Sequence, residues 1–140
     1  MKLRFTALWA TALLLIPFLP MEAKKPVFKN TRWICEHQMM IYDVGTMTET
    51  YTLEFTSAKD CTFTHKWVIP AHPATYVNED GTVDLIPASG NEETSRGTWR
   101  YRRGVLTLRL EDGSERTLHY MDGRLIDPAL PGDALTYRLY

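Results

Sequence analysis

The sequence has no apolar run long enough to cross a bilayer as a helix. Its main apolar stretch, Ala7–Leu19, is shorter than the roughly 20 residues that a transmembrane helix needs. Lys2 and Arg4 precede this stretch, and the small residue Ala23 follows it. Positive charge, an apolar core and then a small residue are the features of an export signal. We therefore expect residues 1–23 to be a signal peptide that is cleaved after Ala23.

Cysteine is also scarce, with only Cys35 and Cys61 in 140 residues. Neither directly follows the apolar stretch, so the pattern that attaches bacterial lipoproteins to a membrane is missing. Residues 24–140 are expected to form one exported domain, periplasmic or secreted, with no membrane anchor after cleavage. Two cysteines in an oxidising compartment predict a disulfide, which would stabilise the fold by about 3.5 kcal/mol on a loop-entropy model.

The chain lacks an excess of charge of either sign. Its formal net charge is −1 at pH 7, and removal of Lys2, Arg4 and Glu22 with the signal peptide leaves it near balance. A nucleic-acid-binding domain needs a concentrated basic footprint. The sequence therefore predicts no nucleic-acid partner.

Catalytic signatures are missing too, since the sequence has no G-x-S-x-G, H-E-x-x-H or C-x-x-C motif. His37 and His65 share strand faces with Cys35 and Cys61, which raises the hypothesis of a copper or zinc site. If the cysteines are bridged, however, their sulfurs are not thiolates, and two histidines are a small ligand set. We expect no metal, no cofactor and no enzymatic activity.

Helical periodicity is missing after the leader, whereas alternation of apolar and polar residues is abundant. Residues Thr48–Thr56 place Tyr51, Leu53 and Phe55 on one face, and Asp60–Ile69 alternates over its whole length. Threonine, aromatic and β-branched residues are frequent in these segments, as is typical of strands. The predicted strands are Thr31–His37, Thr48–Thr56, Asp60–Ile69, Gly97–Arg102, Val105–Glu111, Ser114–Met121, Arg124–Asp127 and Ala134–Tyr140, with a further short strand considered at Thr82–Ile86.

The connections between these strands predict the topology. Asp112-Gly113 and Asp122-Gly123 are strong two-residue hairpin signals, so neighbouring strands should pair in antiparallel order. About eight strands is the number at which a small barrel closes around packed side chains. We expect an all-β protein, a small antiparallel meander barrel. Pro70–Arg96 is expected to be a long loop, either a functional lid or a mobile segment. In the first case Tyr76 and Val83–Ile86 would fold over one end of the barrel.

Four short motifs suggest a family. Thr31-Arg32-Trp33, the strand Tyr51–Phe55, Gly97-Thr98-Trp99 and the turn into Gly104–Leu108 resemble the small lipocalin-like barrel proteins secreted by bacteria. The similarity covers Asn30–Tyr140, and its motifs mostly encode strands and hairpins. The resemblance implies a lipocalin-like barrel and the binding of a ligand or partner. It implies no catalytic residue.

The predicted function is binding of a small apolar ligand or a protein partner. Aromatic side chains near an open barrel mouth would line such a ligand site. The candidate ligand-binding residues are Tyr51, Trp67, Tyr76, Trp99 and Tyr101. The alternative is an exported protein-interaction module, such as a small disulfide-bearing protease inhibitor whose ordered terminus, Lys24–Asn30, protrudes from a filled barrel.

Overall fold

Eight antiparallel strands close into a barrel, as the alternation predicts. The structure is a computed structural model that describes residues 25–128 and 135–140, so the expected signal peptide lies outside the described residues. Around the barrel the strands follow the order β1-β10-β9-β8-β7-β6-β3-β2, and β4 and β5 form a separate two-stranded sheet. The strands are β1 Arg32–Ile41, β2 Gly45–Phe55, β3 Asp60–Ile69, β4 His72–Pro73, β5 Leu85–Ile86, β6 Ser89–Arg102, β7 Val105–Leu110, β8 Glu115–Met121, β9 Arg124–Asp127 and β10 Leu135–Leu139.

Every neighbouring pair of barrel strands is also consecutive in the chain, except where the β4–β5 arm interrupts β3 and β6 and where β10 closes on β1. The barrel is thus a meander with one inserted hairpin. The described residues contain no helix, and therefore none that could cross a membrane. The alternating positions point inward, as expected for pleated strands with one face against a core. Side chains that are almost fully buried include Leu53, Phe55, Leu106, Leu108, Leu118, Leu125 and Tyr137.

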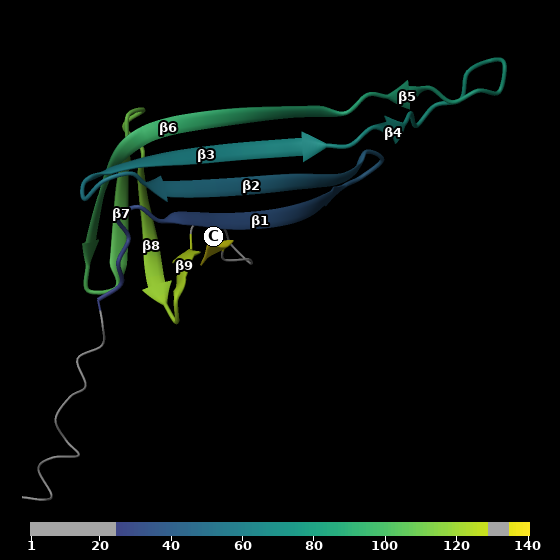
Figure 1. Cartoon of the computed structure of the whole chain (residues 1–140). Helices are drawn as coiled ribbons and strands as arrows, with labels where there is room; N and C mark the ends of the chain where they lie inside the picture. Colours follow the sequence, from purple (N-terminus) through teal and green to yellow (C-terminus); the bar gives the residue numbers. More distant parts are fainter. Residues whose placement is uncertain (1–24, 129–134) are drawn as a thin grey trace, which may run out of the picture.

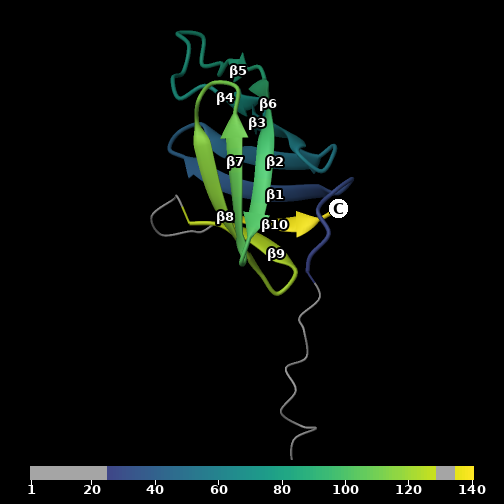
Figure 2. The ribbon, with the colours of Figure 1, turned by 90° about the vertical axis from the view of Figure 1, so that its left-hand side faces the viewer.

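The barrel wall is uneven in height. Strands β1, β2, β3 and β6 are long and continue well past the shorter strands β7–β10, as Figures 1 and 2 show. Strand β6 bends to serve both parts, since its first half pairs with β3 and its second half with β7. The two pairings overlap at Gly97 and Thr98, and a Cβ atom at Gly97 would lie 2.1 Å from the carbonyl oxygen of Arg109. Only glycine allows the two backbones to approach so closely at this corner.

One end of the barrel, here called the base, is plugged by Phe28. This side chain is 2% exposed, and the segment around it is held by the Asn30 N–H, which donates to the Phe55 carbonyl at 2.8 Å. Five aromatic rings lie with centroids between 5.1 and 5.9 Å from the Phe28 ring: Trp33, Phe55, Trp99, Tyr101 and Tyr120. The segment before β1 therefore packs into the barrel, whereas the inhibitor hypothesis needs it to protrude.

The region expected as a loop, Pro70–Arg96, is partly strand. Its last residues, from Ser89, belong to β6 and pair with β3 throughout. The charged residues of this run face solvent on the sheet and do not prevent strand formation. The rest forms an arm around β4 and β5 that extends away from the barrel (Figure 1), and Tyr76 on it is 55% exposed. The expectation that Tyr76 and Val83–Ile86 fold over the barrel is therefore wrong.

The expected disulfide is also wrong, because Cys35 and Cys61 are both free thiols. Across β2, Cys35 lies opposite Tyr51 and Cys61 lies opposite Phe55. Those β2 positions are four residues apart, so the cysteines are offset by about 13 Å along the strands as well as by two strand spacings. A disulfide requires Cα atoms within about 7 Å. Each thiol instead packs in the core, and burial raises the pKa of Cys61 to about 11.

Candidate functional site

The part of the sheet that continues past β7–β10 is here called the overhang, and it consists of residues 37–41, 45–49, 65–69 and 89–93. It arches outward with its inner face open, because no strand of the described residues stands opposite it (Figure 1). Its inner side chains are therefore half-buried to exposed, whereas equivalent positions nearer the base are buried. This open inner face is the candidate site.

Strand register brings polar and aromatic side chains together on the inner face. His37 lies opposite Glu49, and Glu49 lies opposite Trp67 on the next strand. In the neighbouring row, Tyr51 lies opposite His65. Residues directly opposite each other in antiparallel strands share a face, so all five side chains project to the same side.

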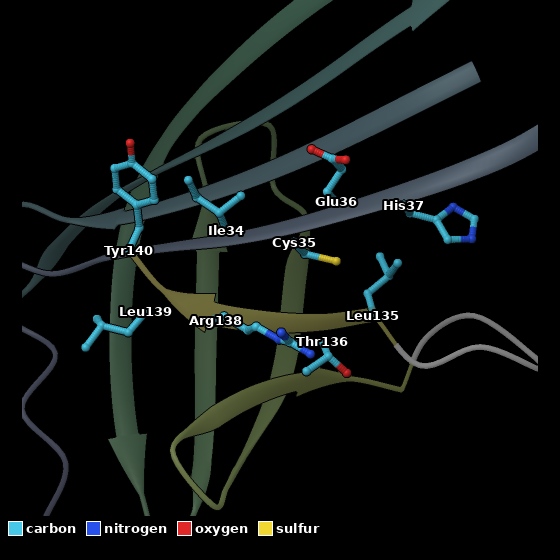
Figure 3. Close-up of a pocket in the computed structure, with 9 residues that line it drawn as sticks. All are labelled: Ile34, Cys35, Glu36, His37, Leu135, Thr136, Arg138, Leu139 and Tyr140. Carbon is cyan, nitrogen blue, oxygen red and sulfur yellow. The ribbon is translucent and has the colours of Figure 1, made fainter. Parts of the chain in front are cut away.

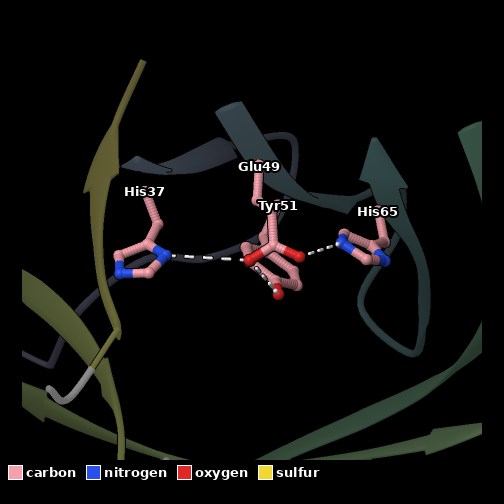
Figure 4. A network of polar contacts seen from close by, with 4 residues as sticks. All are labelled: His37, Glu49, Tyr51 and His65. Atoms are coloured by element: carbon pink, nitrogen blue, oxygen red, sulfur yellow. Dashed lines mark hydrogen bonds and ion pairs between the residues drawn. The ribbon is translucent and has the colours of Figure 1, made fainter. Parts of the chain in front are cut away.

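Glu49 is the centre of a polar network (Figure 4). Its Oε1 lies 3.2 Å from His65 Nε2, and its Oε2 lies 3.7 Å from His37 Nδ1. The Tyr51 hydroxyl donates to Oε2 at 3.3 Å, and the Tyr51 ring stacks on His65 with centroids 4.6 Å apart. The carboxylate side chain is only 14% exposed. A charge held at such low exposure needs several polar partners, and this network supplies them.

The electrostatics of the network keep Tyr51 protonated. Burial raises the pKa of Tyr51, and the nearby Glu49 charge and hydrogen bond raise it further. Its hydroxyl is therefore a donor over the physiological range. The His37 Nδ1 atom is buried and has no hydrogen-bond partner among the described residues, since 3.7 Å is too long for one.

A second polar pair lies deeper in the mouth of the barrel. Arg116 Nη1 lies 3.2 Å from Asp127 Oδ2, and the guanidinium sits 4.3 Å above the centre of the Phe63 ring. Nearby, the Tyr137 hydroxyl is buried with no hydrogen-bond partner in the described part of the chain, and burial strongly raises its pKa. Tyr51 and Arg116 both line an open cleft of about 630 Å³, so Tyr51 connects this cleft to the polar network of Glu49.

The predicted ligand-binding residues separate into three places. Trp67 lies on the inner face of the overhang, and Tyr51 lies on the same face just below it, opposite His65. Trp99 and Tyr101 belong to the aromatic cluster at the base, where Trp99 Nε1 donates to the Ser57 carbonyl at 3.1 Å. Tyr76 lies on the arm, where its hydroxyl donates to Asp84. The candidate set is thus not one site.

The polar members of the site were not predicted as ligand-binding residues. Glu49 continues the inward alternation of Phe55, Leu53 and Tyr51 by one more step. A carboxylate at an inward strand position is unusual unless it is paired. The position of Glu49 in the alternation could therefore have identified it as a candidate site residue. Arg116 offers the same signal, because it precedes the inward Leu118 by two residues.

The two histidines do not converge on a common point. Figure 4 shows His37 and His65 on opposite sides of Glu49, each directed at a different carboxylate oxygen. Within residues 25–128 and 135–140, no group of three or more histidine, cysteine, aspartate or glutamate side chains could hold a metal ion. A comparison of the chain with protein-family models, curated proteins and solved structures finds no match.

Proposed function

We propose that this chain is an exported barrel that binds a small, largely apolar ligand carrying one polar group. The observation that carries the proposal is the half-open inner face of the overhang, where Glu49 and its partners form a polar network beside the apolar surface of Trp67. Binding sites for small molecules combine mostly apolar walls with a few placed polar groups. The adjoining cleft of about 630 Å³ has the size of such a site.

The polar groups of the site favour a ligand with a hydrogen-bonding head. Two buried polar atoms, His37 Nδ1 and the Tyr137 hydroxyl, have no hydrogen-bond partner among the described residues. An unpaired buried polar group costs about 1–3 kcal/mol, and a ligand that pairs with it recovers that free energy. The tail of the ligand would lie against Trp67 and the neighbouring inner-face side chains Met47 and Ile69, which alternate inward with it.

The packed base explains why the site is proposed at the overhang and not inside the barrel. Phe28 and the aromatic rings around it fill the base, and the leucines above them are almost fully buried. Small barrels of eight strands either fill with side chains or hold one small ligand, and this one is filled over its lower half. The mouth remains for binding, and we propose no catalysis there.

Export and the family resemblance are part of the same proposal. The charged start, the apolar stretch Ala7–Leu19 and Ala23 support a signal peptide. The four motifs that resemble secreted lipocalin-like proteins lie in strands or tight turns of the barrel. Intact mass spectrometry of the protein from its native host tests export, with a mature chain that begins at Lys24 as the expected result and an uncleaved chain as the contrary one.

Ligand binding is tested by titrating purified residues 24–140 with N-phenyl-1-naphthylamine, a neutral apolar dye that fluoresces when bound. We expect saturable binding that Trp67→Thr or Glu49→Gln weakens about tenfold, a change of about 1.4 kcal/mol. Tyr76→Ser is the matched control, because Tyr76 is an exposed aromatic residue on the arm, and it should leave binding unchanged. Displacement by long-chain acids, amines and alcohols then identifies the polar head.

Two results would contradict the proposal. One is the absence of saturable dye binding, and the other is binding that Tyr76→Ser weakens while Trp67→Thr does not. The second result would move the site from the overhang to the arm.

A further inference from the structure

Among the described residues, the outer edge of β1 has no hydrogen-bonded neighbouring strand past Ile34. Within the described residues, β10 pairs with β1 only at Trp33 and Ile34. Past Ile34, a groove lies between β1 and β10 as far as His37 and Leu135 (Figure 3). Strand β1 then continues to Ile41, and within the described part of the chain it pairs there only with β2. A sheet edge of this kind presents unpaired backbone donors and acceptors and can pair with another strand.

Two backbone hydrogen bonds at the start of β1 determine which residues point outward from this edge. The Tyr140 N–H donates to the Arg32 carbonyl on the β10 side, and the Phe55 N–H donates to the Thr31 carbonyl on the β2 side. Backbone groups alternate sides along a strand, and pairing with β2 runs without a bulge to Ile41. The N–H and carbonyl groups of Gln38 and Met40 therefore point away from the sheet.

The second free edge of the overhang differs from the first in charge. It belongs to the first half of β6, which pairs with β3 and not with β7, and it carries Glu92 and Glu93. Charges on an edge strand oppose edge-to-edge pairing, above all with a second copy that brings the same charges. On β1, residues 37–41 read His-Gln-Met-Met-Ile, with no aspartate, glutamate, lysine, arginine or proline. This edge lacks the usual protection.

Apolar side chains and a groove accompany the β1 edge. Met40 is 79% exposed and Tyr42 at the following turn is 89% exposed. Beside the edge, an open groove of about 500 Å³ separates β1 from β10, and Glu36 and Arg138 are among the residues that line it (Figure 3). Each chain thus carries exposed apolar side chains at the end of β1 and a groove beside the same strand.

We propose that two copies of this chain pair through antiparallel β1 edges about a two-fold axis at Met39. In this register Met39 faces Met39 of the second copy, and Gln38 faces Met40 of the second copy. The outward backbone groups of Gln38 and Met40 then form four hydrogen bonds, and Tyr42 of each copy comes opposite Glu36, at the groove of the other. No like charges meet, which is the self-complementarity that a two-fold interface requires. The proposal does not depend on ligand binding.

Sedimentation equilibrium of residues 24–140 from about 1 μM to about 500 μM tests the dimer, since small interfaces are weak and transient. We expect a reversible monomer–dimer equilibrium. Met40→Pro should weaken it at least tenfold, because proline removes an outward N–H and leaves the β2 ladder intact. Glu92→Pro is the matched control, since it removes an outward N–H on the β6 edge, and it should leave the equilibrium unchanged.

A charge pair tests the register. Met39→Lys and Met39→Glu should each abolish the dimer, because like charges would face each other across the axis. An equimolar mixture of the two variants should form a heterodimer. A wild-type protein that stays monomeric overturns the proposal, and so does a dimer that survives both Met39→Lys and Met40→Pro. Failure of the mixture to associate, when the wild type does, overturns the register.

Discussion

The base and the overhang are built from the same strands, yet their inward residues have different surroundings. On β2, Phe55 and Leu53 are 1% and 0% exposed, whereas the Glu49 side chain farther along the same face is 14% exposed. The difference lies in the opposite wall, since β7–β10 stand across from the base and end before the overhang (Figure 1). The alternation of apolar and polar residues determines which face of the sheet a side chain joins. Whether that face becomes a buried core or an open site depends on whether other strands stand across from it.

The largest effect on stability is expected at the base, on removal of the Phe28 side chain. Phe28→Ala should lower the free energy of unfolding by about 3–5 kcal/mol, because it removes a buried ring that contacts five others. Urea denaturation measures the loss. Val27→Ala is the control, since Val27 is 76% exposed, and it should change stability by less than about 0.5 kcal/mol. Equal effects of the two variants would show that the base does not depend on Phe28.

The corner that joins the two regions should be nearly as sensitive. Gly97→Ala places a Cβ atom 2.1 Å from the Arg109 carbonyl oxygen, so β6 and β7 must separate. We expect a loss of about 3 kcal/mol, the upper part of the range for overpacking. Thermal unfolding compares it with Thr98→Ala, a change at the exposed neighbouring residue. A Gly97→Ala protein as stable as the wild type would mean that the bend does not require close backbone approach.

Alkaline titration tests the burial of Cys61 in the core. Burial raises the pKa of Cys61 to about 11, so the folded state favours the protonated thiol. Its contribution is complete below pH 9, where both states are protonated, and is lost as the pH rises toward 11, because the unfolded chain ionises first. The loss should reach about 2 kcal/mol. Cys61→Ala should make the fall in stability between pH 9 and 11 shallower, since buried tyrosines such as Tyr137 contribute the remainder, and an unchanged slope would contradict this assignment.

The smallest effect on stability is expected at the overhang. Glu49→Gln keeps the shape of the side chain and removes its charge, so the network with His65 and Tyr51 weakens without leaving a cavity. We expect a change of about 1 kcal/mol in urea denaturation, the contribution of a typical hydrogen bond. A loss as large as that of Phe28→Ala would mean that the polar network supports the fold and is not a site held open by it.

Local alternation and turn chemistry were enough to predict the barrel. Asp122 has a φ of 51° and Gly123 a φ of 75°, the positive values that the predicted hairpin turn requires. Each barrel strand falls on a predicted segment, and the main error is the start of β6. Its first residues include Glu92 and Glu93, which lower strand propensity, but pairing along β3 outweighs that preference.

The positions of the cysteines and of the site could not be predicted in the same way. They depend on the register between paired strands and on how far the strands on opposite sides of the barrel extend. In the sequence, Cys35 and Cys61 both fall at inward positions of predicted strands, so a bridge between them is plausible. Only the pairing of β1 and β3 with β2 shows how far apart they lie. Trp67 and Trp99 look alike in the sequence, as inward tryptophans on long strands. They lie at opposite ends of the molecule, Trp99 within the aromatic cluster of the base.

Closure of the barrel has a consequence for how the chain acquires its fold. Strand β10 joins β1 through Trp33 and Leu139, residues separated by nearly the whole described chain. Contacts of such long range form slowly, because the entropy of ordering the intervening chain is lost before they contribute. A polypeptide still emerging from a ribosome or a translocation channel lacks β10, the strand that closes the barrel. Its sheet therefore has two unpaired edges, on β1 and β9, until residue 139 has been added. Shortening the chain by that final strand should therefore yield a protein that precipitates instead of one that is merely less stable.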